Sequence, residues 1–381
     1  MLTIARCPRN AARVRTFHLS PNNLSTLIRE GGPATNTKHP GERKWGILQR
    51  LASPSRSRQS KGLMVKDQLT SITENMTSLQ ALTIEASPLV SGYFDFVKVK
   101  PRVLDGAWTT YARTLRHLKL TVPIEALDVA LPPRTVHFRH LESLDLHILR
   151  AYPETKAELL LLSTVVPFIS RHSLTLRSLC LHGQDAGNPT SILQYLSFMT
   201  ACTSFSITTK LWSEMTGLYR FLHLHRAQLR HVKVKLLASR SFTFDKALWR
   251  AQPWLRVPMH KLERLDLDFG HVANNCRQTI VAYVLQRRAT LSHLRLASIY
   301  LSIPEAKSLM DGLGGDMMKE LELCLLEFCP SLLECSSKCL PNLERLGLLQ
   351  ATGGLGIDDA VRWTYDVGLS SSGRFLLTLC A

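Results

Sequence analysis

Histidine, cysteine and aspartate recur in this sequence at a spacing that places them on one side of neighbouring strands. Asp145 and His147 are two residues apart, and so are Cys180 and His182. Because residues two apart in a strand point to the same side, each pair would present an imidazole beside a carboxylate or a thiol. These groups are common zinc ligands, so a metal site is one interpretation. We favour the other, a polar binding face with unpaired histidines and no metal.

Sequence signatures of the common enzymes are absent from the chain. It contains no G-x(4)-G-K-[ST] loop, no H-E-x-x-H helix and no G-x-S-x-G turn. The glycine cluster at 353–356 lacks the spacing of a dinucleotide-binding loop. We therefore expect no enzymatic activity, no catalytic residues and no cofactor.

One phrase of the form apolar-x-x-apolar-x-apolar recurs along the chain. It begins at Val14, Leu79, Leu115, Leu141, Leu176, Cys202, Leu229, Leu262, Leu291, Met318 and Leu343. From the second phrase onward the mean period is about 29 residues, at the upper end for leucine-rich repeats. The last two apolar residues of each phrase lie on one side of a short strand, which only stacking with neighbours can bury. The sequence predicts an α/β fold, a leucine-rich-repeat solenoid (a ribonuclease-inhibitor-like horseshoe) with about ten parallel strands on its concave side.

The intervals between phrases contain helix signals, as crossovers between parallel strands require. Ser302 and Glu305 can form a capping box, with Pro304 in the first helical turn. Asn188 predicts the start of a helix that extends to Met199. Residues 273–288 have apolar side chains at helical spacing.

The third, fifth and seventh positions of each phrase should project from the concave side of the strands. From the seventh phrase onward the fifth position alternates in charge, as Lys233, Asp266, Arg295 and Glu322. Such a ladder stabilises neighbouring strands by pairing within the protein. We therefore expect a protein partner to bind the middle strands. The predicted contact residues are His117, Lys119, Asp145, His147, Cys180, His182 and Ser206.

The repeats predict four segments. These are a basic N-terminal segment with a first degenerate repeat strand (1–30), a disordered basic insertion or linker (31–64), the leucine-rich-repeat array (65–350) and a C-terminal cap (351–381). The insertion is rich in Pro, Gly, Ser, Thr and Arg and has no sustained period.

Positive charge is concentrated at the N-terminus. The formal net charge is +17, and residues 1–66 hold thirteen Lys and Arg against two acids. One alternative function is therefore that of a nucleic-acid-associated protein that uses this basic arm. Another is a mitochondrial protein, because the first 29 residues contain five arginines and no acid, as transit peptides do. We favour the repeat strand at Val14 over the transit peptide.

Nine cysteines without a secretory signal argue against a disulfide framework. Cys324, Cys329, Cys335 and Cys339 lack the paired C-x2-C spacing of common zinc sites, so we expect free thiols. The longest apolar run, 159–169, is too short to cross a bilayer. We expect no membrane association and a cytoplasmic or nuclear location.

The sequence resembles the fungal F-box/leucine-rich-repeat proteins. The stretches that carry the resemblance are CPRNAARVRTFHLS (7–20), LRHLKLTVPIEALDVALPP (115–133), LESLDLHI (141–148) and VVPFISRHSLTLRSLCLHG (165–183). The resemblance implies a substrate receptor of a ubiquitin ligase, in which an F-box binds a Skp1-type adaptor and the repeats hold the target. It covers the repeats, about 65–350. No L-P-x-E-like opening precedes the first phrase, so we expect a degenerate or truncated F-box, with the adaptor bound only if an F-box is present elsewhere.

Overall fold

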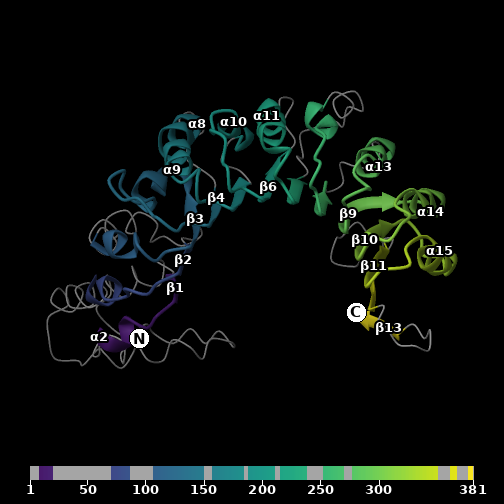
Figure 1. The fold of residues 1–381 in the computed structure, drawn as a ribbon, viewed down its shortest axis with the longest axis horizontal. Helices are drawn as coiled ribbons and strands as arrows, with labels where there is room; N and C mark the ends of the chain where they lie inside the picture. Colours follow the sequence, from purple (N-terminus) through teal and green to yellow (C-terminus); the bar gives the residue numbers. More distant parts are fainter. Residues whose placement is uncertain are drawn as a thin grey trace, which may run out of the picture. The chain divides into compact units, whose positions relative to one another are not determined.

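The computed structural model forms two units, which we describe separately (Figure 1). The first comprises residues 1–192 and 199–201, and the second comprises residues 193–198 and 202–381. The residues whose structure is described are 8–19, 70–85, 106–149, 157–183, 188–210, 215–237, 252–269, 277–350, 361–366 and 376–380. The predicted insertion (31–64), most of the basic arm and the glycine cluster at 353–356 lie outside these residues.

The first unit contains parallel strands that follow one another in chain order. They are β1 (Thr16–Leu19), β2 (Ala81–Glu85), β3 (His117–Pro123), β4 (Ser143–Leu149) and β5 (Ser178–Gly183). Every strand begins at the third position of its phrase, and each pairs in parallel with the next. The strand positions predicted from the phrases are therefore confirmed here.

Short helical segments connect the strands of the first unit. They include α2 (Pro8–Ala11), η1 (Ile124–Ala126), α7 (Leu127–Ala130), α8 (Ala157–Leu160), the π-helical turn η3 (Leu161–Val165) and α9 (Val166–Arg171). Figure 1 shows α8 and α9 together on one side of β3 and β4. The opposite side of those strands therefore carries no described helix.

The second unit repeats this arrangement. Its strands are β6 (Ser204–Lys210), β7 (His231–Leu237), β8 (Arg264–Asp268), β9 (His293–Leu301), β10 (Glu320–Leu325), β11 (Arg345–Gln350), β12 (Val361–Asp366) and β13 (Leu376–Cys380). Strands β6 to β11 are parallel and again begin at the third phrase position. Strands β12 and β13 continue the sheet in antiparallel pairing.

A helical segment lies between each pair of successive strands from β6 to β11 in the second unit. They are α11 (Thr216–His225), η4 (Pro253–Arg256), α13 (Arg277–Leu285), α14 (Ile303–Gly312) and α15 (Ser331–Cys339). The predicted capping box opens α14, where the backbone N–H and hydroxyl of Ser302 each donate to Glu305 Oε2 at 2.8 Å. The structure therefore confirms this start signal.

The helix predicted from Asn188 to Met199 is wrong in length. Asn188 Oδ1 accepts the backbone N–H of Thr190 at 3.0 Å, as an N-terminal cap does. The helix, α10, comprises only Thr190–Leu193. A tight turn follows it, in which the N–H of Leu196 donates to the Leu193 carbonyl.

The apolar positions of the phrases form the core. In β4, for example, Leu144 and Leu146 are fully buried, while Asp145 and His147, which alternate with them, are half-exposed. The same alternation runs through β2, β5 and β7. We call the side formed by the third, fifth and seventh phrase positions the strand face.

Strand β9 departs from the regular register. Leu296 pairs with Leu323, but the next pair is Tyr300 with Cys324, so residues 297–299 have no partner on β10. Ser298 within this bulge has a φ of 59°, which is uncommon for a residue other than glycine. Its hydroxyl donates to Asp268 Oδ1 on β8 at 2.9 Å. This hydrogen bond connects the bulge to the neighbouring strand.

A buried polar side chain lies four residues before three of the phrases. Nδ1 of His172 donates to the Phe168 carbonyl at 2.8 Å, and His225 makes the same contact with Phe221. Arg287 donates to the Tyr283 carbonyl, also four residues back. These side chains satisfy carbonyls at the end of a helix, which otherwise lack partners.

No helix in the described part of the chain is long and apolar enough to cross a membrane. The described cysteines, among them those of the predicted free cluster at 324–339, form no disulfide. Sγ of Cys335 and Sγ of Cys339 lie 3.9 Å apart, one turn apart on α15.

Candidate partner-binding face

Four of the predicted contact residues meet on the strand face of the first unit. The parallel register sets Asp145 beside Cys180 and His147 beside His182. The residues on either side of each of the four are buried, which fixes where the polar side chains emerge. Sequence reasoning therefore placed these four residues together correctly.

Within this cluster, three polar groups surround one carboxylate oxygen. Nε2 of His147 lies 3.1 Å from Asp145 Oδ1, and Nε2 of His182 lies 3.6 Å from the same oxygen. Sγ of Cys180 is in hydrogen-bond contact with Nε2 of His182 at 2.8 Å. The prediction that the two histidines are unpaired is thus wrong, because both contact Asp145. The reason is the register: Asp145 lies at a fifth phrase position, and both histidines lie at the seventh positions next to it.

The carboxylate of Asp145 is held in its charged form. Burial raises its pKa, but contact with His147, the charges of His147 and His182 and contact with Cys180 outweigh burial and lower it overall. Its Oδ1 atom is nevertheless buried and accepts no well-formed hydrogen bond. A buried charged oxygen in this condition favours the approach of a cation or a strong donor.

The cluster does not have the geometry of a catalytic triad. In a triad the base uses one ring nitrogen for the nucleophile and the other for the acid that orients it. Here the sulfur of Cys180 and the carboxylate of Asp145 both face Nε2 of His182. The three groups therefore converge on one point instead of forming a proton relay.

The remaining three predicted residues do not belong to this cluster. His117 is exposed at the start of β3. Lys119 is in register with Asp145, but its Nζ pairs with Glu85 Oε1 on β2 at 3.5 Å. Ser206 lies on β6 in the second unit, in register with Lys233. The structure thus joins four of the seven predicted residues directly.

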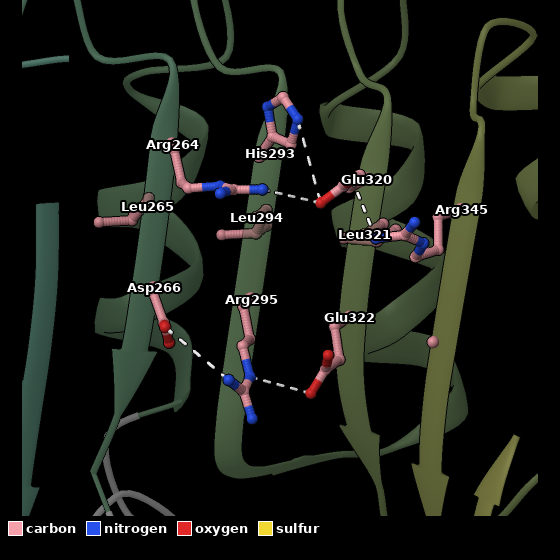
Figure 2. Close-up of a pocket in the computed structure, with 11 residues that line it drawn as sticks. Arg264, Leu265, Asp266, His293, Leu294, Arg295, Glu320, Leu321, Glu322 and Arg345 are labelled. Carbon is pink, nitrogen blue, oxygen red and sulfur yellow. Dashed lines mark hydrogen bonds and ion pairs between the residues drawn. The ribbon is translucent and has the colours of Figure 1, made fainter. Parts of the chain in front are cut away.

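On the second unit the predicted charge ladder is present. Asp266 Oδ2 lies 3.3 Å from the Nζ of Lys233 and 3.9 Å from a guanidinium nitrogen of Arg295. Arg295 also contacts Glu322 Oε1 at 2.9 Å (Figure 2). Each carboxylate in this row therefore faces a cation on the adjacent strand, as the alternation of charge predicts.

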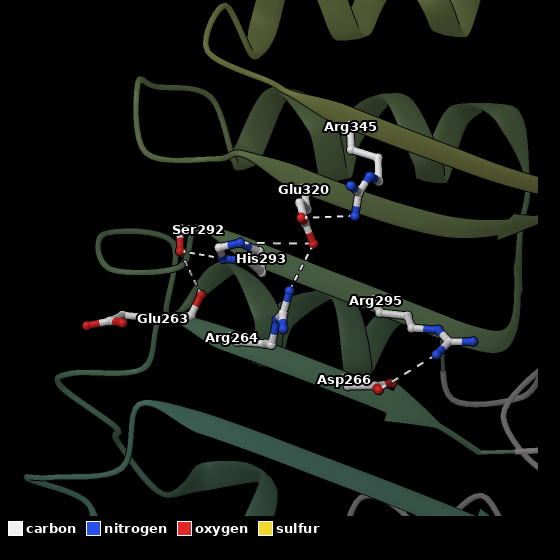
Figure 3. Close-up of polar contacts among 8 residues, drawn as sticks. All are labelled: Glu263, Arg264, Asp266, Ser292, His293, Arg295, Glu320 and Arg345. Atoms are coloured by element: carbon white, nitrogen blue, oxygen red, sulfur yellow. Dashed lines mark hydrogen bonds and ion pairs between the residues drawn. The ribbon is translucent and has the colours of Figure 1, made fainter. Parts of the chain in front are cut away.

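A second row, at the third phrase positions, centres on Glu320. Its Oε2 lies 2.9 Å from Arg264 and 4.0 Å from His293, and its Oε1 lies 3.2 Å from Arg345 (Figure 3). Arg264 is two strands away and reaches past His293. Burial first, and then the charge of Arg264, lower the pKa of His293. This network was not predicted from the sequence.

The two rows line a shallow hollow of about 280 Å³. Its ionic lining consists of Arg264, Arg295, Arg345, Asp266, Glu320 and Glu322, so positive and negative groups balance. At Gly347, which also lines the hollow, the fifth phrase position has no side chain, and this leaves the end of the ladder open. A glycine at a position that is charged in the four preceding phrases is the sequence signal that could have indicated this hollow.

Chains of solved structures match this protein. A chain in the crystal structure of the Rad7 and Elc1 complex in yeast is 13% identical, with a TM-score of 0.42, over 73% of this chain and 71% of that chain. No protein-family model matches the sequence, and no curated protein matches it. The leucine-rich-repeat architecture described above follows from the strand order and register within each unit.

Proposed function

We propose that this chain is a protein-binding scaffold without catalytic activity of its own. The observation that carries the proposal is the parallel register, which brings side chains from equivalent positions into rows on the strand face. Neighbouring strands lie about 4.8 Å apart, so such rows offer closely spaced donors and acceptors to a partner. The backbone beneath them is already paired within the sheet, so side chains supply the recognition.

The binding site in this proposal is the strand face of β3 to β5 in the first unit. The charge distribution supports this choice over the second unit. Asp266 and Glu320 are each contacted by more than one cation, so a partner would have to displace existing ion pairs. Asp145, in contrast, is contacted by the imidazoles of His147 and His182, which are not permanently charged as lysine and arginine side chains are. A partner at this site would therefore have fewer permanent charges to displace.

A comparison of two double variants tests the site. The partner is first identified by affinity purification from the native cell, and its affinity for the wild-type chain is measured by calorimetry. We expect His147→Ala with His182→Ala to weaken binding at least tenfold, and Asp266→Asn with Arg295→Gln to leave it within about twofold. The reverse pattern would place the site on the charge ladder of the second unit.

A finer form of the proposal makes the chain a substrate receptor of a ubiquitin ligase, with a degenerate or truncated F-box. Its support is the resemblance of the repeat stretches to fungal F-box/leucine-rich-repeat proteins. The same purification, scored for a Skp1-type adaptor, tests it. If the adaptor is absent while a control F-box protein recovers it, the receptor role is rejected and the scaffold role remains.

A further inference from the structure

We propose that Asp145, Cys180 and His182 form a binding site for a divalent ion of the zinc class. The inference goes beyond partner binding and requires no partner. It begins from convergence: one carboxylate oxygen, one sulfur and one ring nitrogen of these residues all lie within 4.8 Å of one another. They come from two strands whose register is fixed by buried leucines, so the three donors are held on a rigid frame.

The spacing of the donors suits a tetrahedral ion. Zinc binds sulfur at about 2.3 Å and nitrogen or oxygen at about 2.0–2.2 Å, which sets its ligands roughly 3.3–3.7 Å from one another. Asp145 Oδ1 already lies 3.6 Å from Nε2 of His182. Cys180 Sγ lies 2.8 Å from the same nitrogen, in hydrogen-bond contact with it. An ion that takes the place of this hydrogen bond requires the two atoms to separate by less than about 1 Å.

The chemistry of the donors selects the class of ion. A thiolate and an imidazole are poor ligands for Mg²⁺ or Ca²⁺ and good ligands for zinc and its neighbours. The thiolate and the carboxylate together carry two negative charges, which balance a divalent ion. The buried Oδ1 of Asp145, which accepts no well-formed hydrogen bond, gains a strong partner when the ion binds. Three protein ligands leave a fourth position for water or an incoming side chain.

His147 is a positioning residue in this proposal. Its ring stacks on that of His182, with centroids 3.8 Å apart, and its Nε2 lies 3.1 Å from Asp145 Oδ1. It thus restrains two of the three ligands at once. Loss of such an outer contact weakens metal affinity about 10- to 100-fold in characterised sites.

The test is a titration of the full chain with Co²⁺ after dialysis against a chelator. Cobalt reports its own ligands, because thiolate coordination produces a charge-transfer absorption band. We expect one equivalent of Co²⁺ to develop this band and Zn²⁺ to abolish it. Cys180→Ser should remove the band. The matched control, Cys329→Ser, changes a half-exposed thiol in the second unit and should leave the band intact.

Further variants separate the ligands from residues that only position them. Asp145→Asn should reduce zinc affinity more than His147→Ala, which should reduce it about 10- to 100-fold. Circular dichroism of each dialysed variant checks that the fold is retained. A wild-type chain without the band, or a band equally strong in Cys180→Ser, overturns the proposal. Neither result bears on the partner-binding test, which needs no added metal.

Discussion

The imidazole rings of His147 and His182 lie stacked on adjacent strands, with an angle of 25° between their planes, and both direct Nε2 toward Asp145. Two stacked imidazoles repel each other when both are protonated. The carboxylate between them offsets that repulsion, and the same charges lower the pKa of Asp145. The carboxylate of Asp145 therefore makes it possible for His147 and His182 to stack side by side on adjacent strands.

Replacement of Asp145 by Asn should change how the free energy of unfolding depends on pH under acidic conditions. The pKa of Asp145 is lower in the folded chain than in the unfolded chain, so its contribution is present above about pH 3.9 and is lost as the pH falls below that value. Urea denaturation between pH 3 and 6 measures the effect. We expect a shallower loss of stability below pH 4 in the variant, and parallel profiles would contradict the assignment.

His172 should make the first unit sensitive to pH at higher values. Its Nε2 accepts the N–H of Phe138 at 3.1 Å while Nδ1 donates to Phe168, so the neutral ring is fully used. Burial lowers its pKa to about 4, so the unfolded chain binds more protons between pH 6.5 and 4. The free energy of unfolding should fall by about 3 kcal/mol as the pH falls through this range.

The matched variant is His172→Gln, whose amide can accept and donate at the same two places but does not titrate. Denaturation curves of both proteins at pH 7 and pH 4.5 give the comparison. A pH dependence equally steep in the variant would show that His172 is not responsible for it.

The charge ladder should contribute little at high salt. Arg295 and Glu322 lie at a half-exposed surface, so a double-mutant cycle with Arg295→Gln and Glu322→Gln should give about 0.2–1 kcal/mol at low ionic strength. At 1 M salt the screening length is about 3 Å, and the coupling should approach zero. The pair of Lys319 and Glu344, which is more exposed, serves as the control and should show less coupling throughout.

Two glycines on the strands should respond differently to alanine. A Cβ at Gly183 would lie 2.9 Å from the ring of Pro189, which cannot rotate away, so Gly183→Ala should destabilise the fold by about 1–3 kcal/mol. A Cβ at Gly347 would lie 3.1 Å from Cγ of Glu322, a flexible side chain. Gly347→Ala should therefore cost less, and thermal unfolding of the two variants checks the order.

Thiol reactivity should distinguish two cysteines of the second unit. Burial raises the pKa of Cys202 to about 12, whereas hydrogen bonds from Ser331 lower the pKa of Cys329. Because the thiolate is the reactive form, a maleimide should modify Cys329 well before Cys202 at neutral pH. Peptide mass spectrometry over time measures both, and equal rates would contradict the burial of Cys202.

The strands could be predicted from sequence because their signal is local. Each phrase contains the apolar residues that its own strand buries, and a period of two decides which side chains emerge. Neighbouring phrases then place Asp266 beside Lys233 and Arg295 without knowledge of any rotamer. The fold and the ladder follow from this pattern.

The polar networks around Asp145 and Glu320 could not be predicted in the same way. Arg264 reaches Glu320 across an intervening strand, and that contact depends on the length and rotamer of the arginine side chain. His147 on β4 and His182 on β5 both direct their rings toward Asp145 instead of toward solvent. Such contacts depend on side-chain conformation, which residue spacing does not specify.

The bulge in β9 shows how the repeats can change length without loss of the charged rows. The three additional residues, 297–299, enter the strand beyond the positions that carry His293 and Arg295. Pairing with β10 resumes at Tyr300, so the cost of the insertion is confined to one hydrogen-bonded irregularity at Ser298. Evolution could therefore lengthen or shorten this repeat at its far end while the charged residues of its strand face keep their places.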